Sequence, residues 1–364
     1  MSMDKVENTF LQRTSRWKIV IVLLVLALII TIIVSLGLGS TSVPVKDVFS
    51  IIGKHIPFMD RFIDSSSVPA TSEAIILEAR LPRIIAGVLI GAALAAAGVL
   101  YQGVFKNPMA DSYVLGVSAG AAVGASASIL AGAGVVFFEL RLIQVAAFLG
   151  ALSAMFLVYN LARVGSRVPV TTLLLCGIAV NFFLFAVVGV LEIIAANRLH
   201  DIVFWLMGGY SNVYWQDIWA ILPFIIIGIV LAFFYVRDLN LLAMGEETAH
   251  HLGVNVERSK QILLVLASLI TAAAVSVCGL IGFVGLMIPH LTRLIIGPDH
   301  RILLPTSTII GAIFLVLCDD LARVLSTLFS TMSTRDWPVG IITMLFGAPF
   351  FVFLLKKKKQ SYTT

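Results

Sequence analysis

Charged residues are scarce in this sequence of 364 residues. Asp, Glu, Lys and Arg make up 12% of the chain, against about a quarter in an ordinary soluble domain. Apolar residues make up 59%, and the mean hydropathy is +1.03. One soluble core could not bury that much apolar surface, so a water-soluble enzyme is excluded. Disorder is excluded as well, because disordered chains are poor in apolar residues. The composition predicts a polytopic helical membrane protein.

Cysteine is also scarce. Cys176, Cys278 and Cys318 lie far apart within apolar runs, and no CxxC pair occurs, so the sequence predicts neither a zinc site nor a disulfide framework. His290 and the pair His250-His251 are the remaining candidate ligands. A lone histidine at a membrane end more often bonds a carbonyl than a metal, and the pair is interpreted as loop surface. We therefore expect no metal site.

Two further absences concern the energy source. The sequence has no GxxxxGK[ST] motif, so the chain carries no phosphate-binding loop of its own. No charged residue falls near the middle of an apolar run, where ion-coupled carriers place such groups. The clustered acid, base or nucleophile of a membrane-embedded active site is missing too. We expect no catalytic residue and no cofactor in this chain, so the energy for uphill transport would enter from another subunit.

Long apolar runs are abundant. The first, Ile19–Leu38, is long enough to cross a bilayer and longer than the core of a signal peptide. A polar stretch, residues 39–79, follows it. The next runs without Asp, Glu, Lys or Arg are Ile84–Phe105, Ser112–Phe138, Leu142–Ala162, Val168–Leu191, Ile218–Val236, Ile302–Cys318 and Trp337–Leu355.

One more run, Gln261–Thr292, is too long for a single crossing. Glycines at 279, 282 and 285 interrupt it, so we expect one helix that ends near Cys278 and a second that returns through Pro289. The total is ten transmembrane helices. The sequence thus predicts an all-α fold in which residues 1–364 form a single integral membrane domain.

Basic residues set the orientation of these spans. With the N-terminus inside, 16 of the 25 basic residues face the cytoplasm, which the positive-inside rule favours. We expect a cytoplasmic-membrane protein with a cytoplasmic N-terminus (1–18), loop (237–260) and tail (356–364). Basic clusters beside spans are orientation signals, so no nucleic-acid partner is expected. The 16 residues are Lys5, Arg13, Arg16, Lys18, Lys106, Arg163, Arg167, Arg237, Arg258, Lys260, Arg293, Arg301 and Lys356 to Lys359.

Two patterns concern how the spans pack. The pairs Gly87/Gly91 and Gly116/Gly120/Gly124 have the GxxxG spacing of closely packed helices, within the fold or between subunits. The predicted fifth and tenth spans also begin alike. Pro169–Phe183 and Pro338–Phe351 each carry Pro-Val, an apolar segment ending in glycine, and Phe-Phe. Because these spans cross in opposite directions, the pattern predicts an inverted repeat of spans 2–5 and 7–10.

The predicted cytoplasmic loop, residues 237–260, has more apolar residues than a linker needs. Gly245-Glu246-Glu247 is typical of a helix start, because acidic side chains are favoured at the positive end of the helix dipole. Gly253 would end that helix about two turns later. The loop is either a docking element for a partner or a solvated surface loop.

The chain resembles the FecCD-type permeases of type II ABC importers for iron–siderophore, haem and cobalamin uptake. Four blocks between residues 80 and 355 carry this resemblance in family order. They are Arg80–Arg83 with Gly91–Leu94, Gln102-Gly103, Asn107–Asp111 and Leu115–Ser118; Leu173–Gly177 with Phe204–Gly208; Leu239–Leu242 with Gly245–Glu247 and Leu252–Asn255; and Gly282–His290 with Asp299–Arg301, Leu321–Arg323, Trp337–Gly340 and Gly347–Pro349.

The resemblance implies a transport subunit that makes no covalent chemistry itself. Two such subunits, copies or paralogues, would form one translocation path, and two ABC ATPase subunits would bind ATP and Mg²⁺ and dock on the cytoplasmic loop. The matching coupling residues are Leu239, Asn240, Leu241, Gly245, Glu246, Glu247, Leu252 and Gly253.

Two more sets of residues follow from the resemblance. A substrate-binding protein outside the cell would dock through its acidic residues on Arg80, Arg83 and Arg323; the alternative for these arginines is snorkelling to the interface. The cytoplasmic gate would comprise Asn107, Pro108, Met109, Val170 and Thr171.

The chain also departs from the family pattern. Asp336-Trp337 replaces the usual Glu-Leu before the proline of the last span, and Asp319-Asp320 carries a second carboxylate. The roles of these residues and of His290 are left open, as is the choice between homodimer and heterodimer. The expected cargo is a ferric siderophore, with haem or cobalamin as alternatives and an ATP-independent carrier or channel as another class of function.

Overall fold

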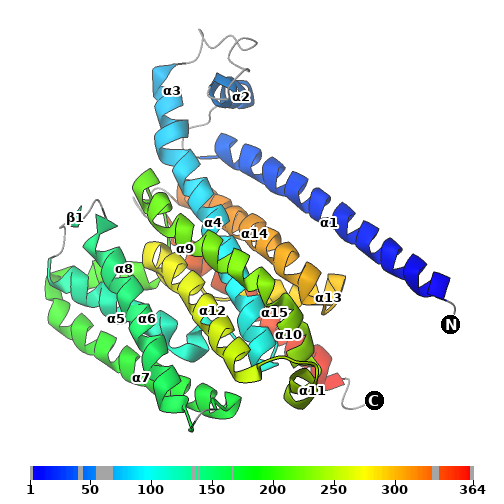
Figure 1. The fold of residues 1–364 in the computed structure, drawn as a ribbon. Coiled ribbons are helices and arrows are strands. Elements are labelled where there is room, and N and C mark those ends of the chain that lie inside the picture. The colour runs from blue at the N-terminus through cyan, green and yellow to red at the C-terminus, as the bar shows by residue number, and fades with distance from the viewer. Residues whose placement is uncertain are drawn as a thin grey trace.

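The computed structural model describes residues 3–39, 44–54, 69–132, 136–137, 140–165, 167–329 and 336–360. The polar stretch 39–79 and the predicted terminal segments 1–18 and 356–364 therefore lie partly outside the described residues. Helices make up almost all of the described chain (Figure 1). The described residues also include a hairpin of two-residue strands, β1 (Val136–Phe137) and β2 (Leu140–Arg141).

The helices follow the order of the predicted spans. Among the described residues, seven helical segments are long and apolar enough to cross a membrane and three are shorter, which together make the ten expected. The helices are α1 (Met3–Gly37), α2 (Val45–Lys54), α3 (Ala70–Ala74), η2 (Ile75–Arg80), α4 (Leu81–Phe105), η3 (Ser112–Leu115), α5 (Val117–Leu130), α6 (Leu142–Ala162), α7 (Val170–Ala195), η4 (Ala196–Arg198), α8 (Leu199–Leu206), α9 (Trp215–Phe234), α10 (Val236–Ala243), α11 (Glu246–His251), α12 (Val256–Cys278), α13 (Val284–Ile296), α14 (His300–Leu328) and α15 (Val339–Gln360).

The two halves of the chain use the same series of helices. In the first half a long helix (α4) is followed by a short one (α5) and two long ones (α6, α7). The second half repeats this order as α12, α13, α14 and α15, although the apolar part of α15 (Val339–Phe353) is shorter than α7. Spans 2–5 and 7–10 therefore correspond, as the inverted repeat requires, and α9 lies between them in the sequence.

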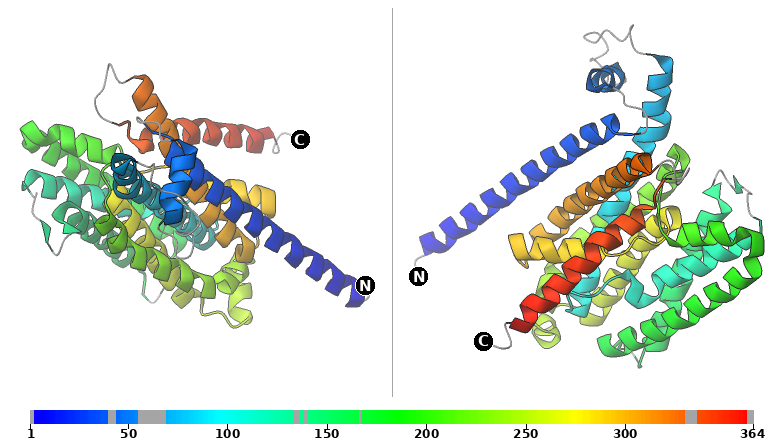
Figure 2. Two further views of the ribbon diagram at one scale, coloured as in Figure 1. Left: turned by 90° about the horizontal axis from the view of Figure 1, so that it is seen from above. Right: turned by 180° about the vertical axis from the view of Figure 1, so that it is seen from behind.

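Helix α4 is the buried centre of the bundle. Its side chains are apolar on all faces and almost all buried, as expected of a helix enclosed by others. It packs against α14, α12, α13 and α9. In Figures 1 and 2, α1 runs along one side of this centre and α7 along the opposite side.

Glycines allow the neighbours of α4 to approach its backbone. A Cβ atom added at Gly91 would lie 2.3 Å from the carbonyl oxygen of Gly311 on α14, and one at Gly98 would lie 1.9 Å from that of Gly285 on α13. On α5, an added Cβ at Gly120 would lie 2.3 Å from the Gly150 oxygen of α6. Gly91 and Gly120, which belong to the GxxxG patterns, therefore serve packing within the chain, as Gly98 does.

The long apolar run breaks where the sequence predicts. Helix α12 ends at Cys278, and both Gly279 and Phe283 have a φ of 67°. The Cys278 carbonyl accepts a hydrogen bond from the Gly209 N–H at 2.7 Å. Such a break is tolerated at membrane depth when other parts of the protein bind its backbone groups, as the Gly209 loop does here.

Residues predicted to lie inside meet at one end of the bundle. Val168 contacts Glu257 there, and Asn240 contacts His300. Figure 1 shows α10 and α11 at this end, with α2 and α3 at the other, and both chain termini lie towards the α11 end. We call the α11 end the inner end and the α3 end the outer end; which one faces the cytoplasm is a prediction from the basic residues.

We expect Gly91→Ala to destabilise the protein by about 1–3 kcal/mol, because the added methyl group must displace the Gly311 carbonyl. The matched control is Gly189→Ala on α7, where an added Cβ has no atom within 4 Å; it should leave stability unchanged or slightly higher. Thermal unfolding in detergent measures both. Equal melting temperatures for the two variants would contradict the close α4–α14 packing.

Candidate functional site

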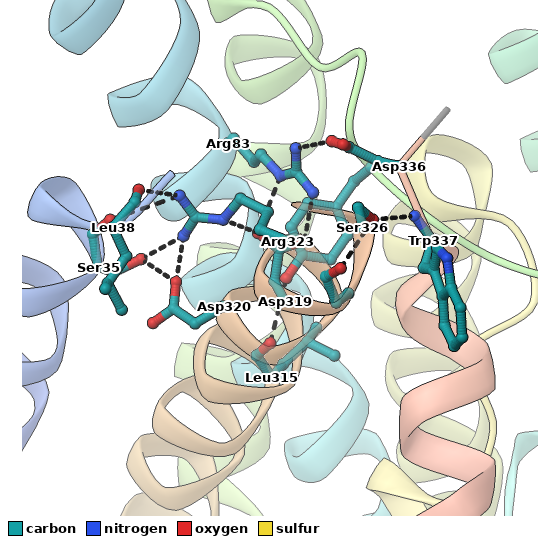
Figure 3. A network of polar contacts seen from close by, with 12 residues as sticks. Ser35, Leu38, Arg83, Leu315, Asp319, Asp320, Arg323, Ser326, Asp336 and Trp337 are labelled. Carbon is teal, nitrogen blue, oxygen red and sulfur yellow. Dashed lines mark hydrogen bonds and ion pairs between the residues drawn. The ribbon is translucent and has the colours of Figure 1, made fainter. Parts of the chain in front are cut away.

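The outer ends of α4 and α14 meet at a buried ion pair (Figure 3). Arg83 of α4 donates from Nε and Nη2 to the two oxygens of Asp319 on α14, each at 2.9 Å. Its third nitrogen, Nη1, donates to Asp336 just before α15. A bidentate ion pair of this kind fixes the relative orientation of the two helices as well as the distance between them.

A second arginine binds the end of α1. Arg323 of α14 donates to the Leu38 carbonyl at 2.9 Å and to the Ser35 hydroxyl at 2.7 Å, and it pairs with Asp320. Arg80 likewise donates to the Leu36 carbonyl at 2.7 Å. The last carbonyls of a helix have no partner in the helix and carry its negative dipole end, so cationic donors stabilise them.

Within the described residues, charges in this outer cluster balance. Three arginines (80, 83 and 323) lie among three carboxylates (319, 320 and 336), and each arginine is at most 9% exposed. Buried charges are tolerated when they are paired and hydrogen-bonded. The structure thus places acidic residues of the same chain against Arg83 and Arg323, two of the three arginines that the resemblance assigns to a binding protein. Their docking role stays a prediction.

A cavity of about 720 Å³ opens beside this cluster. Two blocks that the sequence singles out meet in its lining, Phe204-Trp205 of α8 and Trp337. Burial, with the nearby Asp319 carboxylate, raises the pKa of the Tyr210 phenol well above its ordinary value of 10. Tyr210 therefore stays protonated and donates to the Leu315 carbonyl at 3.2 Å.

At the inner end, the predicted loop folds as two short helices on a buried base. Leu239 and Leu242 of α10 are at most 1% exposed. A Cβ atom added at Gly103 of α4 would lie 2.7 Å from Leu239, so α10 rests directly on the inner end of α4. Helix α11 begins after Gly245 and is followed by Gly253, whose φ of 87° suits a glycine, as the sequence predicts.

Asn240 holds α10 to the start of α14. Its side-chain oxygen accepts a hydrogen bond from the His300 backbone N–H at 2.9 Å and lies 2.8 Å from His300 Nδ1. Its side-chain nitrogen donates to Asp299 at 2.9 Å. The sequence includes Asp299 and His300 in a family block but assigns them no role; a carboxylate before an apolar helix is a typical N-cap signal.

The two predicted coupling glutamates differ in their surroundings. Glu246 pairs with Lys260 at 2.9 Å, whereas Glu247 is exposed. Met244 and Leu252 are 68% and 52% exposed beside it. A hollow of about 900 Å³ lies between α11 and Arg167. The inner end therefore presents both apolar and acidic groups on its surface.

The two predicted gate segments lie at the inner ends of α4 and α7. Asn107 closes the turn after α4, where its side-chain oxygen accepts from the Met109 N–H at 3.0 Å. Val170 is the first residue of α7, and Thr171 is exposed. Helix α7 packs on η3, because an added Cβ at Gly177 would lie 1.8 Å from the Val114 oxygen. The segments are thus joined through η3.

The histidines form no metal-binding cluster in the part of the chain that the structure describes, where no three His, Cys, Asp or Glu side chains gather around a common point. The His250 and His251 rings are 6.2 Å apart on the exposed surface of α11. His290 Nδ1 has no hydrogen-bond partner among the described residues, so the expected bond to a carbonyl is not found at that nitrogen.

Comparison with known sequences decides the family. The sequence model of the FecCD transport family matches residues 27–357, which is most of the chain. The chain belongs to the FecCD transport family. The four blocks of motifs and the ten spans are thus those of an ABC importer permease.

Relatives of this FecCD permease carry several kinds of metal chelate in their names. The cobalamin import system permease of Halobacterium salinarum is 47% identical over 80% of this chain and 76% of that protein. The hemin transport system permease of Yersinia pestis is 40% identical over 78% and 84%. The Fe(3+) dicitrate permease of Escherichia coli is 36% identical over 80% and 85%.

Solved structures agree with this assignment. An inward-facing metal-chelate type ABC transporter has a TM-score of 0.78 and 29% identity, over 93% of this chain and 98% of that one. PsaBC of Streptococcus pneumoniae, solved in complex with Fab, shares the fold at a TM-score of 0.51 and 19% identity, over 75% of this chain and 90% of that one.

We expect Asp319→Ala to destabilise this permease by about 3–5 kcal/mol, because it leaves the buried Arg83 guanidinium without its two-pronged partner. The matched control is Asp336→Ala. The Asp336 side chain is 39% exposed, so its loss should cost no more than about 1 kcal/mol. Thermal unfolding in one detergent compares them. A larger loss for Asp336→Ala would contradict the burial of the Asp319 pair.

Proposed function

We propose that this chain is the permease subunit of an ATP-driven importer that takes up metal chelates across the cytoplasmic membrane. The observation that carries the proposal is the inner end, where two short helices on a buried base present exposed Met244, Glu247 and Leu252. A partner that binds and hydrolyses ATP needs such a surface, and the chain has no phosphate-binding loop. The family and its solved relative support this.

The proposed partners follow from the two ends. ATPase subunits, which bind ATP and Mg²⁺, dock on α10 and α11 in the cytoplasm. Both chain termini lie in the cytoplasm as well. A second permease copy or paralogue completes the translocation path. A substrate-binding protein docks at the outer end, where its carboxylates meet Arg83. Because Asp336 is the more exposed of the two partners of Arg83, it is the one that a docking carboxylate displaces.

The transport cycle in this proposal alternates access between the two ends. Cargo enters beside the outer cavity, where Trp205 and Trp337 line the wall. The gate segments Asn107–Met109 and Val170-Thr171 close the inner end until the ATPases move α10 and α11. The permease contributes shape and movement, and the ATPases contribute the chemistry.

The cargo class is a metal chelate. The family resemblance favours a ferric siderophore, and relatives named for iron complexes support that choice. Cobalamin has support from the 47% identity with a cobalamin permease, and haem from the 40% identity with a hemin permease. Uptake of a radiolabelled ferric trihydroxamate, cyanocobalamin and haem by the same vesicles decides among the three.

We expect Glu247→Lys to weaken binding of the ATPase partner by about tenfold, because it reverses the charge of an exposed residue in the proposed interface. Glu247 is the better choice than Glu246, whose carboxylate is already bound by Lys260. Glu78→Lys is the matched control, since Glu78 is also exposed but lies at the outer end. The ATPase activity that copurifies with tagged protein measures binding. Equal recovery from both variants would refute the docking surface.

A further inference from the structure

The coupling segment, helices α10 and α11, is joined to both predicted gate segments. Its first connection is the packing of Leu239 on Gly103, described above. Gly103 lies four residues before Asn107, where the first gate segment begins. Helix α10 therefore contacts the end of α4 that leads into the first gate segment. The connection to the second gate segment runs through Lys260.

Lys260 is a buried cation at the inner end that lies between two partly exposed carboxylates. It is 5% exposed. Its Nζ lies 2.9 Å from Glu246 on α11 and 3.2 Å from Glu257 in the first turn of α12. Burial of a lysine is costly without such partners, so the two carboxylates and the ammonium group hold one another in place.

Glu257 extends the network to α7. One of its oxygens binds Lys260, and the other accepts a hydrogen bond from the Val168 backbone N–H at 3.0 Å. Val168 lies two residues before Val170, the first residue of α7 and of the second gate segment. A continuous series of bonds thus runs from α11 through Glu246, Lys260 and Glu257 to the start of α7.

We propose that Lys260 is a positioning residue that transmits the movement of α11 to the inner end of α7. The inference rests on the proposed function, because the ATPase partner is what moves α11. The network has a buried cation between two carboxylates on different helices, so displacement of Glu246 pulls on Glu257 and on the Val168 backbone. Both gate segments then respond to one docking event.

The experiment compares three variants of the full chain, purified with its ATPase partner and placed in lipid vesicles. Lys260→Met removes the cation, Glu246→Gln detaches α11 alone, and Lys260→Arg keeps the charge. Arg258→Met is the matched control, because Arg258 is a neighbouring exposed cation on the same helix. The probe is whichever of ferric trihydroxamate, cyanocobalamin and haem the wild type takes up.

We expect Lys260→Met and Glu246→Gln to lower the amount of probe taken up per ATP hydrolysed by about tenfold, with the ATPase still bound. Lys260→Arg should restore most of it, and Arg258→Met should equal the wild type. Hydrogen exchange at the Val168 amide should be faster in Lys260→Met, which loosens Glu257. It should be unchanged in Glu246→Gln, which leaves Glu257 bound to Lys260.

Two results would overturn the proposal. One is an unchanged ratio of uptake to ATP hydrolysis in Glu246→Gln. This variant should fold normally, because the Glu246 side chain is 43% exposed. The other is unchanged Val168 exchange in Lys260→Met. A purely structural role would lower stability without changing the ratio in the folded fraction. If wild-type vesicles show no ATP-dependent uptake at all, the proposed function fails, whereas the exchange comparison still tests the Lys260 network.

Discussion

The packing of α4 is the constraint on which the rest of this structure depends. Its glycines admit the backbones of α14 and α13 at contact distance, and its inner end admits Leu239 of α10. At the contacts with α14 and α13 no side chain separates the backbones, so a shift of one helix has to be accommodated by its neighbours. One buried helix therefore connects the charged cluster at the outer end with the coupling segment at the inner end.

At both ends of the bundle, buried basic side chains are paired with carboxylates. At the outer end, arginines bind carboxylates and the last carbonyls of α1, which holds α1, α4 and α14 together. At the inner end, a buried lysine binds two glutamates. Paired charges of this kind cost little once formed, but breaking one pair leaves a charge buried alone. Such ion pairs therefore hold neighbouring helices rigidly to one another.

The spans, their number and the helices of the coupling segment could be predicted, because the length and spacing of apolar runs decide them. The break after Cys278 was predictable from the glycines at positions 279, 282 and 285. The partner of Arg83 was not, since Asp319 lies far from it in the sequence and only the crossing of α4 and α14 brings the two together. Asp320 and Arg323, by contrast, are three residues apart on α14, a spacing that can be read in the sequence. Lys260 precedes a long apolar run and looked like an orientation signal; its burial depends on where α11 folds back.

The most direct test of the central claim is the ATP dependence of uptake in vesicles that contain this permease with its ATPase partner. The account predicts that a metal chelate accumulates inside only when ATP is present and the partner can hydrolyse it. Equal uptake by the permease alone, without ATP, would contradict the account and make the chain a carrier or channel.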